Sequence, residues 1–530
     1  MEADLVLTNA KIRTMDRQSP IAEAVAVRCG RIVAVGDKAA VGEWITKATK
    51  VWDAQGGCVL PGFCDSHIHL VEYGLGLERV RLDGLPSLGQ AVERINVRAS
   101  QVQPGEWVLG RGWNHNLWPG SRFPSRHDLD PVTPRNPVYL PGKDGHSAWV
   151  NSLALTLAGL DSHTVDPPGG ALDRDPRSGD LTGILKEGPA MEWVERVIGR
   201  PSLETRSRGV RLAVSALHQH GIASVHSAED EEGLETLQVV EASGHLTLRV
   251  NVMIPDGCVD ALRRIRLHSG FGGEFLRLGP VKIFADGALG SRTADMFESY
   301  CLEPGNRGIE VTTSLRLEEL IEGSLAGGLS VAVHAIGDRA NSRVLDVLEK
   351  HQDLWRKRGL RPRIEHVQLL APGDAQRLGS LGIVASMQPI HCTSDMLMAD
   401  RFWGERSRNA YAWRSLKQAG AVLAFGSDAP VEVPNIIHGL HAAVTRQRAD
   451  GTPTEGWYPE ERLTAEEAVE AYTLGGAYAA GEESSRGSIT VGKVADMTVL
   501  SQDPITVSPD ELLSTQVMGT VVDGEVVFRR

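Results

Sequence analysis

The sequence lacks three features, and each absence excludes a class of protein. Its 530 residues contain no run of about 20 apolar residues, so no membrane-spanning helix is expected. The N-terminal segment MEADLVLTNAKIRTMD has no basic region followed by an apolar stretch, which argues against a secretory signal and favours a cytoplasmic protein. The six cysteines form no CxxC pair and are typical of small buried side chains in a reducing compartment.

Positive charge is also scarce. The chain has 55 Lys and Arg against 68 Asp and Glu, a formal net charge of −13, and no long basic run. Binding to a phosphate backbone needs clustered basic side chains, so nucleic acid is not an expected partner. We expect a small-molecule substrate and no membrane partner, and assembly into a homo-oligomer stays open.

Both ends of the chain have the pattern of short strands. Residues 1–61 alternate apolar and polar side chains between turns, and residues 481–530 do the same. Asp523-Gly524 is a typical tight hairpin turn. Short hairpins are only marginally stable alone, so we predict that the two ends together form one small β-sandwich.

The middle of the chain alternates apolar strands with helical patterns. This repeat predicts a (β/α)8 barrel of the α/β class within residues 62–480. A doubly wound open sheet is the alternative, but no Gly-rich phosphate loop follows a strand. The eight strands are expected at residues 59–70, 221–227, 248–254, 280–287, 329–335, 361–367, 382–389 and 421–429.

A long insertion separates the first and second predicted strands. Residues 71–220 are too many for an ordinary barrel connection, and the segment is rich in Trp, Pro and Gly. We predict that residues 71–202 form an insertion within the barrel domain. Loops at the C-terminal ends of barrel strands build the active site, so we expect the insertion over the barrel mouth.

Two histidines mark the end of the first predicted strand. His67 and His69 are two residues apart, and side chains at that spacing point to the same side of a strand. Both imidazoles can therefore reach one metal ion. An HxH pair alone is a weak signal, because it occurs often by chance.

Four further residues strengthen the metal hypothesis. His334, His366 and Asp428 each end a predicted strand, and imidazole and carboxylate are usual ligands of Zn²⁺ and similar ions. Lys282 lies in an apolar strand, where an unpaired ammonium would be costly. All these strand ends face the same end of a barrel, so the sequence predicts a metal centre there.

The motifs around these residues resemble a known family. PGFCDSHIHL, VKIFADGALGSRTA, VAVHAIGDRAN, RIEHVQ and FGSDAPV are similar to those of the amidohydrolase superfamily. The closer resemblance is to its YtcJ-like branch, which includes N-substituted formamide deformylases. It covers nearly the whole chain, including GWNHNLWP and KDGHSAWVNS of the insertion.

The resemblance implies a role for each metal ligand. His67 and His69, with Asp428, would hold the more buried ion, and His334 and His366 the more exposed one. One or two ions would bind, since some relatives work with a single ion. Lys282 matches the lysine that reacts with CO₂ in related enzymes and gives a carbamate between two ions.

A hydrolytic mechanism follows from this set. A bound divalent ion lowers the pKa of water toward about 7 and polarises a carbonyl. Asp428 is the predicted catalytic residue, because it can accept the water proton and pass it to the leaving amine. The sequence thus predicts a metal-dependent hydrolase of an amide or formamide C–N bond. Four side chains are weaker candidates for substrate binding: Trp113, His146, Arg292 and His391.

Two other functions compete with amide hydrolysis. A metal-dependent deaminase of a heterocycle usually has a Glu soon after the fifth-strand histidine, whereas AIGD follows His334. A non-catalytic assembly protein with this fold would have lost ligands, yet all six positions are filled.

Overall fold

The computed structural model describes residues 2–82, 84–142, 147–167, 170–290 and 292–530. The chain forms two compact units, one of Met1–Gly74 with Ser207–Arg530 and one of Leu75–Arg206. The insertion predicted at 71–202 overlaps the second unit, and the domain division and its place over the barrel stay predictions. No helix within the described ranges has the length and apolar character needed to cross a bilayer.

The first unit contains a parallel barrel. Eight strands pair side by side in the order β21-β20-β19-β18-β17-β16-β15-β8. The strands are largely buried, which is expected when helices cover one face and side chains fill the other. Their bounds are β8 Phe63–Ile68, β15 Ile222–Ala228, β16 Arg249–Pro255, β17 Leu276–Phe284, β18 Val331–Ala335, β19 Arg363–His366, β20 Val384–Met387 and β21 Val422–Phe425.

The first and last strands come together and nearly close the barrel. Ile68, at the end of β8, forms a parallel bridge with Ala429, which follows β21. Every other neighbouring pair of the barrel is also parallel, for example β18 with β19, where His334 lies beside Glu365. The predicted (β/α)8 barrel is therefore confirmed.

Helices follow the strands, and local sequence explains where they begin. Asp230 caps α8 by accepting a hydrogen bond from the Gly233 amide at 2.8 Å. In α11, Val344, Leu345 and Leu348 form a buried stripe. The helices that accompany the barrel are α2 Leu70–Leu77, α7 Leu203–Gln219, α8 Glu231–Ala242, α9 Val259–Ile265, α10 Ser314–Ala326, α11 Asp338–Lys350, α12 Gln352–Lys357, α13 Asp374–Leu381, α14 Pro389–Trp403, α15 Trp413–Gln418, α16 Ile436–Thr445, α17 Ala465–Ala471 and α18 Leu474–Ala479, with 3-10 turns η2 Asp256–Cys258, η3 Gly404–Asn409 and η4 Pro459–Glu461.

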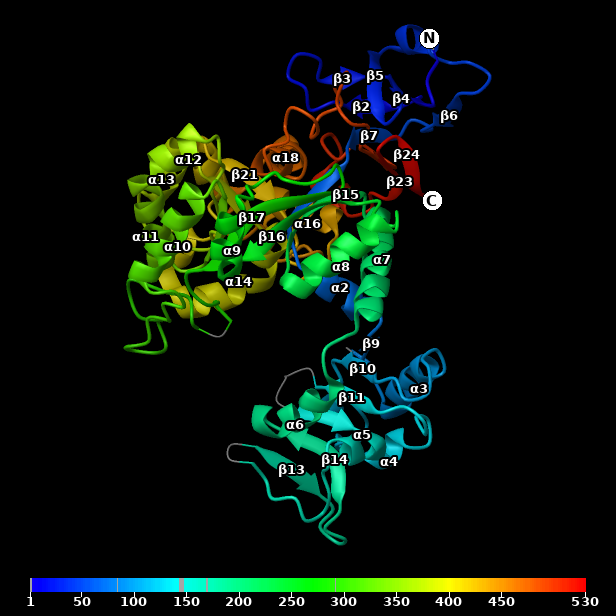
Figure 1. The fold of residues 1–530 in the computed structure, drawn as a ribbon, viewed down its shortest axis with the longest axis vertical. Helices are drawn as coiled ribbons and strands as arrows, with labels where there is room; N and C mark the ends of the chain where they lie inside the picture. Colours follow the sequence, from blue (N-terminus) through cyan, green and yellow to red (C-terminus); the bar gives the residue numbers. More distant parts are fainter. Residues whose placement is uncertain (1, 83, 143–146, 168–169, 291) are drawn as a thin grey trace. The chain divides into compact units, whose positions relative to one another are not determined.

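The two ends of the chain build two further sheets. One has the order β5-β4-β1-β6, and the other, β24-β23-β22-β7-β2-β3, joins strands from both termini (Figure 1). Their elements are β1 Leu5–Thr8, β2 Lys11–Arg13, β3 Ile21–Ala22, β4 Ala24–Arg28, β5 Arg31–Gly36, α1 Lys38–Gly42, β6 Lys50–Asp53, β7 Cys58–Pro61, β22 Met497–Leu500, α19 Pro509–Leu512, β23 Val517–Val522 and β24 Glu525–Arg529.

These two sheets share one apolar core. Leu7 and Val25 of the first sheet cluster with Val59, Met497 and Val521 of the second. Burying this shared face stabilises strands that are too short to persist alone. The predicted sandwich from both termini is confirmed. The predicted turn between β23 and β24 has positive φ at its two central residues, 53° at Asp523 and 79° at Gly524, as a type I′ hairpin requires.

The second unit has its own sheet and core. Its strands have the order β13-β14-β12-β11-β10-β9. Tryptophans 113, 118 and 149 lie in its apolar core. The elements are β9 Val80–Arg81, α3 Leu88–Ala99, β10 Val108–Arg111, η1 His115–Leu117, α4 Arg126–Leu129, β11 Val138–Pro141, β12 Ser147–Val150, α5 Ser152–Leu157, β13 Ala171–Arg174, β14 Leu181–Lys186 and α6 Gly188–Ile198.

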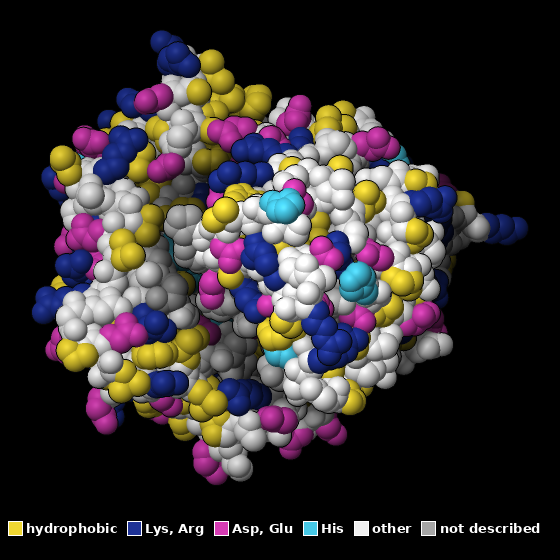
Figure 2. All heavy atoms as spheres, turned by 90° about the horizontal axis from the view of Figure 1, so that it is seen from below, with side chains coloured by type: hydrophobic (Ala, Val, Ile, Leu, Met, Phe, Trp, Pro, Cys, Tyr) yellow, Lys and Arg dark blue, Asp and Glu magenta, His cyan; other side chains and the backbone are white. Residues whose placement is uncertain are grey.

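Surface charges of both signs are mixed. On the face drawn in Figure 2, Lys and Arg side chains are interspersed with Asp and Glu side chains. This distribution agrees with the small excess of acidic over basic residues in the sequence. The expectation that nucleic acid is not a partner stays a prediction.

Candidate metal centre

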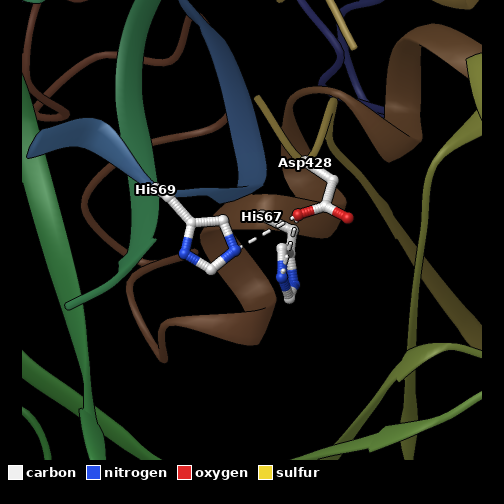
Figure 3. Close-up of side chains that lie close together, drawn as sticks. All are labelled: His67, His69 and Asp428. Carbon is white, nitrogen blue, oxygen red and sulfur yellow. Dashed lines mark ion pairs between the residues drawn. The ribbon is translucent and has the colours of Figure 1, made fainter. Parts of the chain in front are cut away.

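Three predicted ligands meet where β8 and β21 end. The Nε2 atoms of His67 and His69 lie 3.6 Å and 3.3 Å from Oδ1 of Asp428, so the three side chains converge (Figure 3). One nitrogen or oxygen from each lies within 4.8 Å of the others, as a shared metal ion would require.

The backbone holds this convergence in place. The Asp428 amide donates to the His67 carbonyl at 2.7 Å, and the His69 amide donates to the Ala429 carbonyl at 2.8 Å. Asp428 has a φ of 59°, in the left-handed region that non-glycine residues seldom occupy. Such strain persists only where surrounding structure enforces it, and it is common at functional sites.

Two more predicted ligands lie beside the first three. The ring centroids of His334 and His366 are 4.5 Å apart, and those of His366 and His67 are 4.9 Å apart. Nδ1–H of His366 donates to Oε1 of Gln388 at 2.8 Å, and Nε2–H of His334 donates to the Gly287 carbonyl at 3.0 Å. Each contact fixes a tautomer and leaves the other ring nitrogen free to bind metal.

His391 completes a second converging set. One ligand atom each of His366, His391 and Asp428 lies within 4.8 Å of the others. His391 comes from α14, and its ring is stacked with that of His366 at 6.2 Å between centroids. The sequence predicts His391 only as a substrate-binding candidate. Unlike His334, His366 and Asp428, it does not end a predicted strand.

Three of the four candidate histidine ligands are held in the neutral form that binds metal, whereas for the fourth, His69, burial lowers the pKa but the hydrogen bond with Asp428 raises it more. Burial, followed by the nearby charge of Lys282, lowers the pKa of His67 to about 4 and that of His334 to about 3. Burial and the neighbouring His334 also hold the pKa of His366 well below its usual value. A neutral imidazole offers a lone pair, so these rings are ready ligands at neutral pH.

Asp428 is held in its ionised form. Burial raises the pKa of this carboxyl, but the hydrogen bond with His69 and the electrostatic interactions with the His67 and His366 rings lower it more, and the net shift is strongly downward. A buried carboxylate among imidazoles fits a divalent cation.

Lys282 is a buried amine without a partner. Its Nζ accepts and donates no hydrogen bond among the described residues and lies 4.9 Å from the centre of the Phe284 ring. Burial lowers the pKa of Lys282 to about 8. A bare ammonium here is costly, so the amine fits the predicted conversion into an anionic ligand.

A buried network of ion pairs contacts His67 at Nδ1, the ring nitrogen that faces away from Asp428. Nδ1–H of His67 donates to Oε2 of Glu365 at 2.5 Å, and Nε of Arg363 donates to Oε1 of Glu365 at 2.5 Å. Arg363 also donates to the Ser66 carbonyl and to Nδ1 of His226, each at 2.6 Å. All of these side chains are buried.

The sequence patterns do not predict this network of ion pairs behind His67. A regular strand would turn Glu365 away from the ligands because its neighbour His366 is one of them. Instead, the backbone leaves the strand conformation at His366, where φ is 75°, and both side chains reach the interior. One sequence feature does indicate the network: Arg363 and Glu365 are two residues apart in an apolar strand and so point to the same side. Charged side chains buried in a barrel are costly unless they pair, so their presence suggests an ion pair.

Arg292, a predicted substrate-binding residue, and Asp286 both lie in the segment after β17. Arg292 pairs with Glu303 and lies against the Phe402 ring, 5.4 Å from its centre. Asp286 accepts from the backbone amides of Ile336 and Gly337 and so ties the loop after β17 to the loop after β18.

The insertion residues belong to the second unit. The Trp113 indole is buried and donates to the Leu140 carbonyl at 2.6 Å. His146 lies outside the described residues. Substrate binding by either residue stays a prediction.

All six predicted ligands line one cavity of about 360 Å³. Its walls add the apolar side chains of Phe284, Leu289, Ile336, Met398 and Val431. Cavities with apolar walls and a few convergent polar groups are typical small-molecule sites. The six ligands named from the sequence are His67, His69, Lys282, His334, His366 and Asp428.

Comparison with known proteins gives a consistent result. The chain is 37% identical to the protein LONG AFTER FAR-RED 3 of Arabidopsis thaliana, covering 99% of this chain and 92% of that protein. It is 32% identical to YtcJ of Bacillus subtilis over 98% of both chains. It is 30% identical to the N-substituted formamide deformylase of Arthrobacter pascens, covering 99% of this chain and 98% of that enzyme.

A solved structure and a family model agree with these relatives. An uncharacterized metal-dependent hydrolase of Pyrococcus furiosus superposes with a TM-score of 0.78 at 30% identity, covering 95% of this chain and 100% of that one. The model of the amidohydrolase family matches residues 50–528, which include the barrel strands and all six predicted ligands. The chain therefore belongs to the amidohydrolase family.

Proposed function

We propose that this protein hydrolyses the C–N bond of a small amide or formamide and depends on one or two divalent metal ions, with zinc as the first candidate. The single observation that carries the proposal is the convergence of six potential ligands on one cavity. The similarity to an N-substituted formamide deformylase supports hydrolysis of a C–N bond.

The donor chemistry fits such ions. His67, His69 and Asp428 would hold one ion, and His334 and His366 would hold the other. Four imidazoles and a carboxylate are ligands that Zn²⁺ accepts. His391 is within reach of the second position and is a further candidate ligand.

Lys282 would supply a shared oxygen ligand. Its neutral amine would attack CO₂, forming an N–C bond and releasing one proton, which gives Lys–NH–COO⁻. The lowered pKa of about 8 makes the neutral amine more abundant at physiological pH than in an ordinary lysine. The product would replace a buried amine without a partner by an anionic ligand for the bound ions, which would remove the cost of an unpaired ammonium.

Asp428 would move the proton. A bound divalent ion would activate water and polarise the substrate carbonyl. The Asp428 carboxylate accepts a proton from the attacking water and then delivers it to the leaving nitrogen. Its second oxygen, Oδ2, lies 3.9 Å from Nε2 of His391, so this imidazole would stabilise the carboxylate during transfer.

A substrate screen tests the proposal. Metal-loaded protein is incubated with N-formyl amines, N-acyl amines, cyclic amides, simple esters and aminopurines, and the released amine or ammonia is measured. We expect turnover of N-formyl or N-acyl amines. Turnover of aminopurines alone would assign a deaminase, and no turnover of any class by protein with bound metal would overturn the proposal.

A further inference from the structure

We infer that the substrate is an N-substituted amide that keeps its N–H and carries no negative charge, with Gln368 binding the amide and Glu432 and Asp395 selecting against anions. This inference rests on the proposed function and narrows it to a substrate class. Each of the three residues lines the same cavity as the six ligands.

The charge of the cavity beyond the ligands is negative. Asp395 accepts a hydrogen bond from the Tyr411 hydroxyl at 2.7 Å, and Glu432 accepts one from the Ser394 hydroxyl at 2.6 Å. Neither carboxylate forms an ion pair with a Lys or Arg within the described ranges. The charge of Glu432 is therefore not neutralised by a Lys or Arg, and the basic side chain that acts on Asp395 is His391, while burial raises the pKa of Asp395.

The cavity also offers little to an anionic substrate. Among the described residues that line it, Lys282 is the single Lys or Arg, and it belongs to the ligand set. Recognition of a substrate carboxylate normally uses an Arg or Lys placed away from the reacting group. An anionic tail would instead meet Asp395 and Glu432 with no Lys or Arg beside them, and like charges repel strongly in a partly buried site.

Gln368 offers an unused hydrogen-bond acceptor. It follows His366 by two residues, and its carbonyl accepts from the Tyr411 amide at 2.8 Å, which holds the backbone. The side chain is 4% exposed, and its Oε1 has no hydrogen-bond partner in the described part of the chain. A buried acceptor is costly until a donor arrives, and the N–H of a secondary amide is such a donor.

The remaining wall favours an apolar substituent. Phe284, Leu289, Ile336, Met398 and Val431 contribute alkyl and aromatic surface to the cavity. A hydrocarbon group on the amide nitrogen would bury its surface there, and its burial adds binding energy. A secondary formamide with an alkyl substituent therefore satisfies both the wall and Gln368.

The first experiment tests the effect of substrate charge with three formamides that have similar hydrocarbon chains. N-hexylformamide is neutral, 6-formamidohexanoate is anionic, and N-(6-aminohexyl)formamide is cationic. We expect kcat/KM for the anion to be at least about tenfold below that of the neutral probe, and the cation to equal or exceed it. Glu432→Gln should shrink this gap, whereas the matched surface change Glu405→Gln should leave it unchanged.

The second experiment tests the role of the amide N–H. It compares the secondary amide N-hexylformamide with the tertiary amide N-hexyl-N-methylformamide. Wild-type protein should prefer the secondary amide, and Gln368→Leu should lower its kcat/KM by about 10–100-fold while changing the tertiary amide little. Gln368→Glu keeps an acceptor oxygen and should keep the preference. Gln238→Leu, on the exposed face of α8, is the matched control.

The outcomes separate the inference from the proposed function. If metal-loaded protein hydrolyses neither these formamides nor the N-acyl amines of the substrate screen, the proposed function fails. If it hydrolyses the formamides but the anion is as good as the neutral probe, or Gln368→Leu leaves the secondary-to-tertiary ratio unchanged, the inference is wrong and the function stands. The comparison of the three charged and neutral probes on wild-type protein tests the charge selectivity even if a variant fails to fold.

Discussion

Glu365 holds His67 through a hydrogen bond of 2.5 Å from Nδ1–H to Oε2, near the C-terminal ends of β8 and β19. Burial raises the pKa of Glu365, but the charge of Arg363 and the contact with His67 lower it more, and the carboxyl stays ionised. The contact fixes the tautomer of His67 and turns Nε2 toward Asp428.

Glu365→Gln should therefore weaken metal binding without removing any ligand. The amide can still accept from Nδ1–H, but it loses the negative charge that strengthens the imidazole and pairs with Arg363. We expect zinc affinity to fall by about 10–100-fold, measured by competition with a chromophoric chelator. Glu319→Gln on the surface is the control, and equal affinity in both variants would contradict a role for Glu365.

The metal content is the broadest prediction. Purified protein should carry about one to two equivalents of Zn²⁺ or a similar ion, measured by elemental analysis. A chelator should abolish activity and lower the melting temperature, because an ion that binds only the folded state stabilises it. Full activity in strong chelator, with no bound metal, would refute the assignment of a metal centre.

Asp428→Asn tests proton transfer. Asparagine keeps the shape and one coordinating oxygen but cannot accept a proton at neutral pH. We expect kcat to fall by about 10²–10⁴, while metal content falls much less than in His67→Ala. Near-normal kcat with intact metal would mean that another group moves the proton, and His391 would be the first candidate.

Lys282 gives a pH-dependent prediction. CO₂ reacts with the neutral amine only, so carbamate formation by metal-free protein should slow about tenfold per unit as pH falls below about 8, the pKa of Lys282. The growth of the carbamate signal is followed by ¹³C NMR with ¹³C-labelled CO₂, at a dissolved CO₂ concentration that is kept equal at every pH.

Lys282→Ala is the matching variant. It should lack the carbamate signal and lose most activity, and a short-chain carboxylic acid with added metal should restore part of it. Full activity of this variant would remove Lys282 from the site.

The sequence by itself determined the barrel, and it placed six candidate ligands at or near the ends of its strands. Apolar strands and helical patterns repeat locally, and residues such as His334 and Asp428 stand at strand ends, which a parallel barrel brings to one side. The two-residue spacing of His67 and His69 likewise needs only the geometry of a strand.

Only the tertiary structure decided which side chains surround the ligands. His391 lies on a helix, and Gln368 lies beyond a strand end, so neither has a periodic pattern that marks its direction. Glu365 faces His67 because the backbone turns to a φ of 75° at His366, which strand periodicity cannot anticipate. Such irregular positions depend on contacts between distant segments, whereas sequence patterns report mainly on neighbours along the chain.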